Sequence, residues 1–279
     1  MIMFDQYCLG VDLSHWQAAL QWDPLVRAGV RFAIIKASQG SYGRDLSCGA
    51  HLRNAGQAGM ICGIYHWFDP GCSAQSQLTN LKAAVEGREF AFLALDVEQY
   101  WQNWEMSKRA LKENHFSAAL ISRRSLEMAQ LVRETWQKPV LIYTRASFVH
   151  DYALDMQTWL RHWPLWVAHY PYPSGRVSLS WETLKTHYSP TIRNPLIPPG
   201  GKNWHFWQFS GDKFVLPGIN APLDLNFFHG SLQDLQVWCG LPASSKAWTL
   251  EEKMSLLWQA HPQLWQNKEE RDEQQTQTG

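Results

Sequence analysis

Two acidic residues stand two positions apart at the end of one apolar run. The run FLALDVEQYW begins at Phe92 and contains Asp96 and Glu98. Alternate residues of a β-strand point to the same side and lie about 6.5 to 7 Å apart at Cα, so both carboxyl groups should project from one face of the strand end. Taken alone, this pattern also fits a helix N-cap, a metal ligand or a solvated rim.

Two further carboxylates lie near the ends of other apolar runs, Asp12 in GVDLSHWQ and Asp224 in APLDLNFFHG. If these strand ends meet, four carboxyl groups share one cleft, and repulsion raises the pKa of at least one of them. Glycoside hydrolysis needs such a set, because one acid protonates the leaving oxygen and one anion balances the developing positive charge. We expect Glu98, at the outer position of its pair, to be the general acid and Asp96 to be its catalytic partner. Asp12 and Asp224 are expected to have positioning roles.

Other side chains in or at the ends of the predicted strands are candidates for sugar contacts: Lys36, Tyr65, Tyr143, Trp166, Trp207 and Gln208. Aromatic faces pack on the C–H surfaces of sugars, while polar neighbours bond hydroxyl and acetamido groups. For each residue, packing in the core or rim is an equal alternative. Tyr100, Trp101 and Trp104 follow the acidic pair and either shape a sugar subsite or cover the barrel end.

The elements that must position these residues alternate along the chain. Short β-branched or aromatic runs predict strands at residues 9–11, 32–35, 61–65, 92–97, 140–143, 165–168 and 205–209. Segments between them have helical periodicity, for example 46–58 and 118–136. Such alternation implies parallel strands joined by crossover helices, and seven or eight strands in about 230 residues favour a closed barrel. The expected fold is α/β, a TIM-like barrel.

The barrel is expected to span residues 1–230, with a different unit after it. Residues 231–265 are predicted to form a linker or edge segment, at 231–241, and a short amphipathic helix, where Thr249 and Glu252 make a capping box. That helix is either a cap on the barrel or a contact for a protein partner. Residues 266–279 lack hydrophobic side chains and are expected to be disordered.

Charge and composition exclude some classes of partner. The chain of 279 residues has 25 basic and 25 acidic side chains and a formal net charge of +0, so no global attraction draws it to nucleic acid or an anionic membrane. The 16 Trp, 9 Tyr and 12 Phe residues suit a protein that stacks on flat polar ligands such as sugars. No run approaches 18 apolar residues and the N-terminus lacks an export signal, which predicts a soluble chain.

Metal ions and cofactors are not expected. The five cysteines are widely spaced without a CxxC pair, which argues against a zinc site and a disulfide framework. His15, His66 and His169 sit beside strand ends, and we expect them to form hydrogen bonds. Cleavage of a glycosidic bond by acid and base catalysis requires no cofactor.

Eight blocks of the sequence resemble, in this order, the signature blocks of glycoside hydrolase family 25: GVDLSHWQ, FAIIKASQG, AGMICGIYHWF, LALDVE, PVLIYT, LWVAHY, WQFS and LDLNFF. The resemblance implies an irregular (β/α)5β3 barrel and places the family's acids at Asp12, Asp96, Glu98 and Asp224. It also implies a lysozyme that cleaves the β-1,4 bond after N-acetylmuramic acid in bacterial peptidoglycan. Gln39 departs from the pattern, because an acid is frequent there.

The sequence leaves three functions open. The protein is a peptidoglycan muramidase, a hydrolase of another N-acetylhexosamine polymer such as chitin, or a glycan-binding structural component without activity. The presence of all four acids favours the first.

The spacing of the two acids predicts the stereochemical outcome. Asp96 and Glu98 should lie too close together for an inverting mechanism, which needs about 6.5 to 9.5 Å between carboxyl groups, so retention of configuration is expected. The nucleophile is either Asp96 or the substrate's 2-acetamido group, and the resemblance favours the acetamido group. The expected place of action is the bacterial cell wall, reached as a phage-encoded lysin or by a separate export route.

Overall fold

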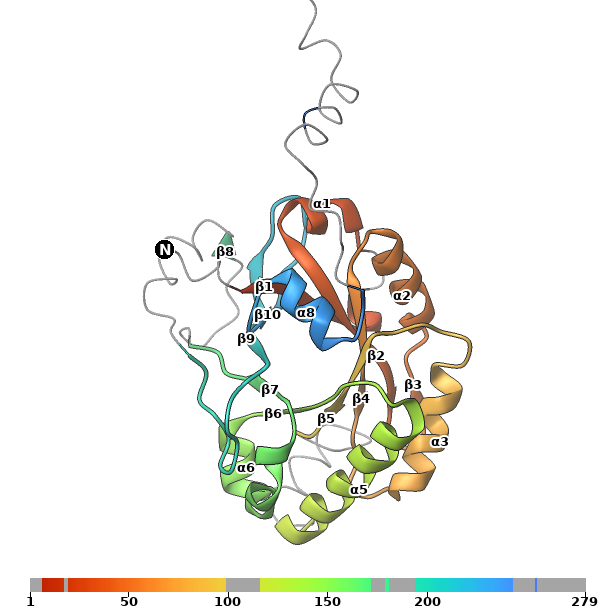
Figure 1. The fold of residues 1–279 in the computed structure, drawn as a ribbon, viewed down its shortest axis with the longest axis vertical. Helices are drawn as coiled ribbons and strands as arrows, with labels where there is room; N and C mark the ends of the chain where they lie inside the picture. The colour runs from red at the N-terminus through yellow and green to blue at the C-terminus, as the bar shows by residue number, and fades with distance from the viewer. Residues whose placement is uncertain are drawn as a thin grey trace, which may run out of the picture. The chain divides into compact units, whose positions relative to one another are not determined.

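Eight strands form a closed ring in the computed structural model, which describes residues 7–17, 20–98, 116–171, 179–180, 194–242 and 254 (Figure 1). In ring order the strands are β1 (Cys8–Leu13), β2 (Val30–Gln39), β4 (Ile61–Trp67), β5 (Phe92–Asp96), β6 (Val140–Thr144), β7 (Leu165–Ala168), β9 (Phe206–Val215) and β10 (Leu223–Phe228). Neighbouring strands are parallel, except that β10 runs antiparallel to both β9 and β1. Pairing of β1 with β2 closes the ring. The predicted α/β barrel is confirmed.

Helices follow the first five ring strands, and Figure 1 shows α2, α3, α5 and α6 around the outside of the ring. The helical elements before the last three ring strands are η2 (His15–Gln17), α1 (Trp22–Arg27), α2 (Cys48–Gln57), α3 (Ala74–Ala84), α5 (Ala118–Trp136), α6 (Ala146–Tyr152), η3 (Leu154–Thr158) and η4 (Leu160–His162). Two short strands lie off the ring: β3 (Gly43–Arg44) pairs with β2, and β8 (Leu179–Ser180) pairs with β9. This is the irregular arrangement of five strand–helix units and three further strands.

Helix α5 has the same limits as the helix predicted from periodicity, residues 118–136. The residues at its two ends explain where it begins and ends. Ser117 is the N-cap, and its hydroxyl accepts a hydrogen bond from the backbone N–H of Leu120 at 3.2 Å. The helix ends where Gln137 adopts a left-handed conformation with φ of 51°. Both ends are therefore set by local residues, without help from the rest of the fold.

Side chains of the ring strands alternate between the barrel interior and the layer under the helices. Two glycines make room inside, because a Cβ at Gly10 would lie 2.2 Å from the ring of Phe32, and one at Gly63 would lie 2.3 Å from the ring of Phe92. The two phenylalanines are fully buried and belong to the interior cluster. Small residues on one strand thus accommodate large residues on the next.

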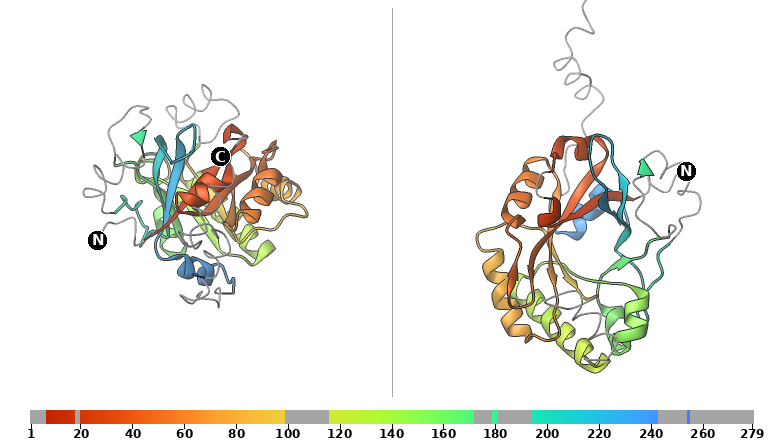
Figure 2. Two further views of the ribbon diagram at one scale, coloured as in Figure 1. Left: turned by 90° about the horizontal axis from the view of Figure 1, so that it is seen from above. Right: turned by 180° about the vertical axis from the view of Figure 1, so that it is seen from behind.

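Helix α8 (Leu232–Trp238) closes the end of the barrel where the parallel strands begin. Its Trp238 ring lies 5.6 Å from Phe92, 5.5 Å from Phe206 and 6.2 Å from Phe228, between ring centroids. Figure 1 shows α8 in front of the ring, and the reverse view in Figure 2 shows it behind. Residues 231–241, expected to be a linker or edge segment, therefore contain a helix packed on the barrel.

The chain divides into two compact units, residues 1–241 and 242–279. The first unit includes α8, whereas the boundary expected from the sequence is at residue 230 and stays a prediction. The amphipathic helix predicted from Thr249 lies outside the described residues except for Met254, and so does the polar end at 266–279.

All five cysteines are free thiols. Among the described residues, no helix combines the length and apolar character that a membrane span requires.

Candidate active site

A cleft of about 980 Å³ opens where the parallel strands end, opposite α8. In a parallel barrel this end carries the loops that build active sites. The acidic residues singled out from the sequence all line it: Asp12, Asp96, Glu98 and Asp224. Lys36, Tyr65, Tyr143, Trp166 and Gln208 line it as well, and a wall is added by residues 218–222 between β9 and β10.

Strand β5 presents its two acids by simple alternation. Asp96 ends the strand with 4% of its surface exposed, Val97 is fully buried in the outer layer, and Glu98 lines the cleft again. The backbone N–H of Val97 donates to the carbonyl of Tyr143 at 2.9 Å, so the chain stays paired with β6 for one residue beyond Asp96. That bond keeps both carboxyl groups on the same side.

Asp12 is an anchored acceptor at the centre of a polar network. Its Oδ2 accepts hydrogen bonds from Nε2 of Gln208 and from Nδ2 of Asn226, both at 2.8 Å. The hydroxyl of Tyr143 donates to Oε1 of Gln208 at 2.8 Å, and the indole N–H of Trp166 donates to Oδ1 of Asn226 at 2.8 Å. These donors fix the orientation of both amides, which therefore present N–H groups to the Asp12 carboxylate.

Asp224 lies directly across from Asp12 in the antiparallel β1–β10 pair. Residues at opposite positions of such a pair point to the same face, here the cleft. Two acids side by side concentrate negative potential at this wall. A substrate whose transition state gains positive charge is stabilised by that potential.

The proton affinities of the acidic pair are strongly shifted. The pKa of Glu98 is raised to about 7, because burial and the charge of Asp12 raise it by more than Arg145 and Lys36 lower it. Burial also raises the pKa of Asp96 well above its usual range, and repulsion from Glu98 adds to this. Asp96 Oδ1 is buried without a hydrogen-bond partner among the described residues. One carboxyl group of this pair can therefore hold a proton near neutral pH.

Lys36 is the cation of the cleft and partly offsets this repulsion. It lowers the pKa of both Asp96 and Glu98, while burial lowers its own pKa. Its Nζ donates to Oε1 of Gln39 at 3.1 Å and lies 4.4 Å from the centre of the Trp67 ring. Since residue 39 is a neutral amide, it forms no ion pair that would compete with the two acids for the lysine charge.

Trp207 does not reach the cleft, so its expected sugar contact is corrected. Its side chain is fully buried in the outer layer, and its indole N–H donates to the carbonyl of His169 at 2.8 Å. Gln208, the next residue on β9, points into the barrel and contacts Asp12. The strand period of two explains the difference, because neighbouring residues face opposite sides.

The three histidines beside strand ends differ in their surroundings. His15 bonds Asp45 through Nδ1 at 3.1 Å. His66 is fully buried between Ser38 and Gln77, and burial lowers its pKa to about 4. His169 has a buried Nδ1 without a partner among the described residues. Within the described part of the chain, no group of three or more His, Cys, Asp or Glu side chains is arranged to hold a metal ion.

The structure adds residues to the site that were not predicted from the sequence: Trp16, Trp67 and Tyr170 are among those that line the cleft, and the buried Asn226 bonds Asp12. The signal for Asn226 was present, because it stands two residues after Asp224 on the same strand. Tyr170 donates its hydroxyl proton to Gln208 but follows β7 in a segment without a clear period. The predicted subsite residues Tyr100, Trp101 and Trp104 lie outside the described residues.

Paired acids in a deep cleft at this end of an α/β barrel define a glycoside hydrolase site. The model of the glycosyl hydrolases family 25 matches residues 11–219. The chain belongs to this family and is a glycoside hydrolase. The match contains Asp12, Asp96 and Glu98, and Asp224 follows it by five positions.

The chain is also similar to individual proteins in sequence and in fold. The uncharacterised protein YegX of Escherichia coli K12 is 29% identical over 235 residues, covering 82% of this chain and 72% of YegX. Lysozyme M1 of Streptomyces globisporus is 26% identical, over 80% of this chain and 68% of the lysozyme. The bacterial lysozyme of Streptomyces coelicolor has a similar fold, with a TM-score of 0.65 at 24% identity, over 83% of this chain and 96% of that one.

Proposed function

We propose that this protein is a muramidase that cleaves the β-1,4 bond between N-acetylmuramic acid and N-acetylglucosamine in bacterial peptidoglycan. The observation that carries the proposal is the convergence of four acids on one cleft, with the pKa of Glu98 raised to about 7. A carboxyl group with this pKa is still partly protonated at neutral pH, as a proton donor must be. The similarity to Lysozyme M1 supports the choice of peptidoglycan.

In this proposal, Glu98 donates a proton to the glycosidic oxygen as the bond breaks. Asp96 stays ionised and orients the substrate's 2-acetamido group, whose oxygen attacks the anomeric carbon from the opposite face. Glu98 then accepts a proton from the water that opens the cyclised sugar, so both carboxyl groups return to their starting states. Asp12 and Asp224 stabilise the positive charge, and the amides of Gln208 and Asn226 hold Asp12 in place.

Replacement of the general acid tests the activity. Glu98→Gln should lower turnover on purified peptidoglycan about 10²- to 10⁴-fold, because proton donation contributes that much. Glu86→Gln changes an exposed glutamate outside the cleft and should leave turnover unchanged. Both variants should unfold at the temperature of the parent or above. Near-normal activity of folded Glu98→Gln would remove this residue from the mechanism.

The identity of the new reducing ends tests the substrate. Reduction of the products with borohydride should convert muramic acid and not glucosamine to its alcohol. Cleavage of chitin at an equal or higher kcat/KM would assign the protein to another N-acetylhexosamine polymer. Binding of both glycans without cleavage would make it a glycan-binding component.

Retention of configuration is the stereochemical part of the proposal. Its support is the placement of Asp96 and Glu98 two residues apart on one strand end. NMR of the first product should show the β-anomer, and a thiazoline mimic of the cyclised sugar should inhibit. An initial α-product would exclude retention. A β-product without thiazoline inhibition would instead make Asp96 the nucleophile.

A further inference from the structure

Trp16 is unlike the other tryptophans of the fold. It is 81% exposed and lines the cleft, while every other tryptophan that the structure describes is buried or half-buried. Exposure of an indole leaves a large apolar surface in water, which a ligand with a complementary face can cover. The position of Trp16, four residues after Asp12, places this surface at the rim beyond the end of β1.

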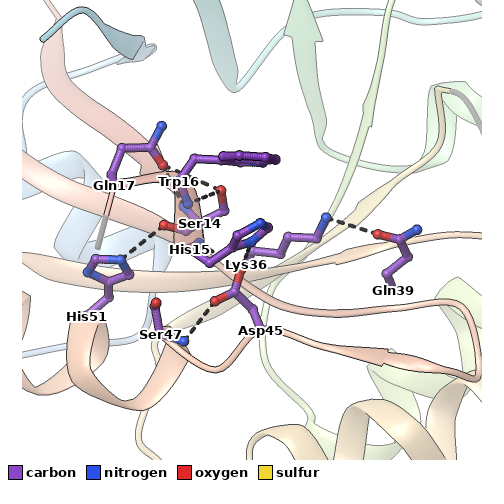
Figure 3. A network of polar contacts seen from close by, with 9 residues as sticks. All are labelled: Ser14, His15, Trp16, Gln17, Lys36, Gln39, Asp45, Ser47 and His51. Carbon is purple, nitrogen blue, oxygen red and sulfur yellow. Dashed lines mark hydrogen bonds and ion pairs between the residues drawn. The ribbon is translucent and has the colours of Figure 1, made fainter. Parts of the chain in front are cut away.

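The backbone that carries Trp16 is held in a tight turn. In η2 the N–H of Gln17 donates to the carbonyl of Ser14 at 3.0 Å, and the Gln17 side chain accepts from the N–H of Ser14 at 2.9 Å. The carbonyl of Ser14 also contacts Nε2 of His51 from helix α2, at 3.2 Å. The turn is therefore bonded both within itself and to the helix beside it (Figure 3).

A buried carboxylate fixes the residue beside the indole. Asp45, whose side chain is 1% exposed, accepts from the backbone N–H of His15 at 2.9 Å and contacts His15 Nδ1 at 3.1 Å. The other oxygen of Asp45 accepts from the N–H of Ser47 at 2.9 Å. Asp45 has no free rotation under these bonds, so the imidazole that it holds is fixed as well.

The imidazole of His15 supports the indole. The two rings lie 4.6 Å apart between centroids with 36° between their planes, and Figure 3 shows the imidazole between the indole and Asp45. Lys36, which lines the cleft, passes beside His15 and extends toward Gln39 in the same view. The order from the core outward is therefore a buried acid, an imidazole and an exposed indole.

We infer that Trp16 is a platform on which a sugar ring of the glycan strand stacks, and that Asp45 and His15 are its positioning residues. The inference rests on the proposed function, because the ligand is the same glycan that occupies the acidic cleft. The C–H face of a pyranose ring covers an indole face without requiring a bond to a particular hydroxyl. The platform therefore adds affinity for a chain of sugars at a site separate from the bond being cleaved.

The first test separates binding from chemistry. Trp16→Ala should raise KM on soluble peptidoglycan strands about threefold to tenfold and change kcat less than twofold, because the platform does not touch the reacting atoms. Trp16→Tyr should restore most of the affinity. Leu46→Ala is the matched control, since Leu46 is 96% exposed next to Asp45 but does not line the cleft. An unchanged KM in Trp16→Ala, or a loss confined to kcat, would overturn the platform.

A double-mutant cycle tests the positioning role of His15. His15→Ala should raise KM less than Trp16→Ala does, and the double variant should match Trp16→Ala alone, because His15 acts through the indole. Fully additive effects would show that His15 contributes independently and would overturn its role in the platform.

A third measurement keeps this inference separate from the proposed function. Calorimetry on Glu98→Gln with N-acetylhexosamine oligosaccharides, with and without Trp16→Ala, measures the platform without turnover. Weaker binding with Trp16→Ala would support the platform even if the parent protein failed to cleave peptidoglycan. Equal binding would reject it even if cleavage were normal.

Discussion

Lys36 acts on the proton affinity of both acids of the pair, whereas Arg145 acts on Glu98. Lys36 opposes the burial and repulsion that raise the pKa of Asp96 and Glu98. Activity requires a protonated acid and an ionised partner. It should therefore fall as pH rises through about 7, and it should also fall at low pH, where the second carboxyl group becomes protonated.

Lys36→Met should move both limbs of the pH–activity profile to higher pH, by roughly half a unit to one unit. The sign follows because loss of the cation makes each carboxyl group easier to protonate. The measurement is kcat/KM against pH, and Lys36→Arg, which keeps the charge, should leave both limbs near their original positions. Movement to lower pH, or an equal shift in Lys36→Arg, would contradict this electrostatic account.

The sequence predicted those site residues whose positions follow from the alternation of side chains along a strand. Asp96 and Glu98 are two apart on one run, and the structure brings both to the cleft. For Trp207 the sequence left a sugar contact and a packing role equally open, because a short apolar run shows which residues alternate but not which of the two sets faces inward. The contact between Asn226 and Asp12 spans 214 positions, and no local pattern could predict it.

Helix α8 packs its apolar side chains on one end of the barrel interior. Trp238 contacts three phenylalanine rings at this end of the barrel, and Leu235 is fully buried. The capping box between Ser231 and Asp234 begins the helix, yet the sequence reading gave these residues to a linker or edge segment. A helix of seven residues has too few turns for its periodicity to be evident, and here tertiary packing stabilises it.

Trp238→Ala should lower the free energy of unfolding by about 2 to 4 kcal/mol, because it leaves a cavity against the phenylalanine rings. Val237→Ala, at the neighbouring position, is 64% exposed and should change it by less than about 0.5 kcal/mol. Urea unfolding followed by circular dichroism would measure both. Equal midpoints for the two variants would mean that α8 does not stabilise the barrel.

For the whole molecule, the boundary of the folded unit decides which part is sufficient for activity. A chain ending at Leu241 should unfold cooperatively and keep the kcat/KM of the full chain on soluble glycan, because it retains the barrel and α8. A chain ending at Gly230 lacks α8 and should unfold at a markedly lower temperature. Equal stability of the two shortened chains would support the boundary expected from the sequence, and loss of activity at Leu241 would give residues 242–279 a role in catalysis.

Closure of the ring also determines when the site can exist during synthesis. Strands β1 and β2 are neighbours in the chain and in the ring, but β10 must be inserted between β9 and β1 at the end. The growing polypeptide on the ribosome therefore carries Asp12 for most of its elongation without Gln208, Asn226 or the opposing Asp224. Contacts this distant form late in folding. The acidic site of this glycoside hydrolase is therefore complete only when the last strand of the ring has been synthesised.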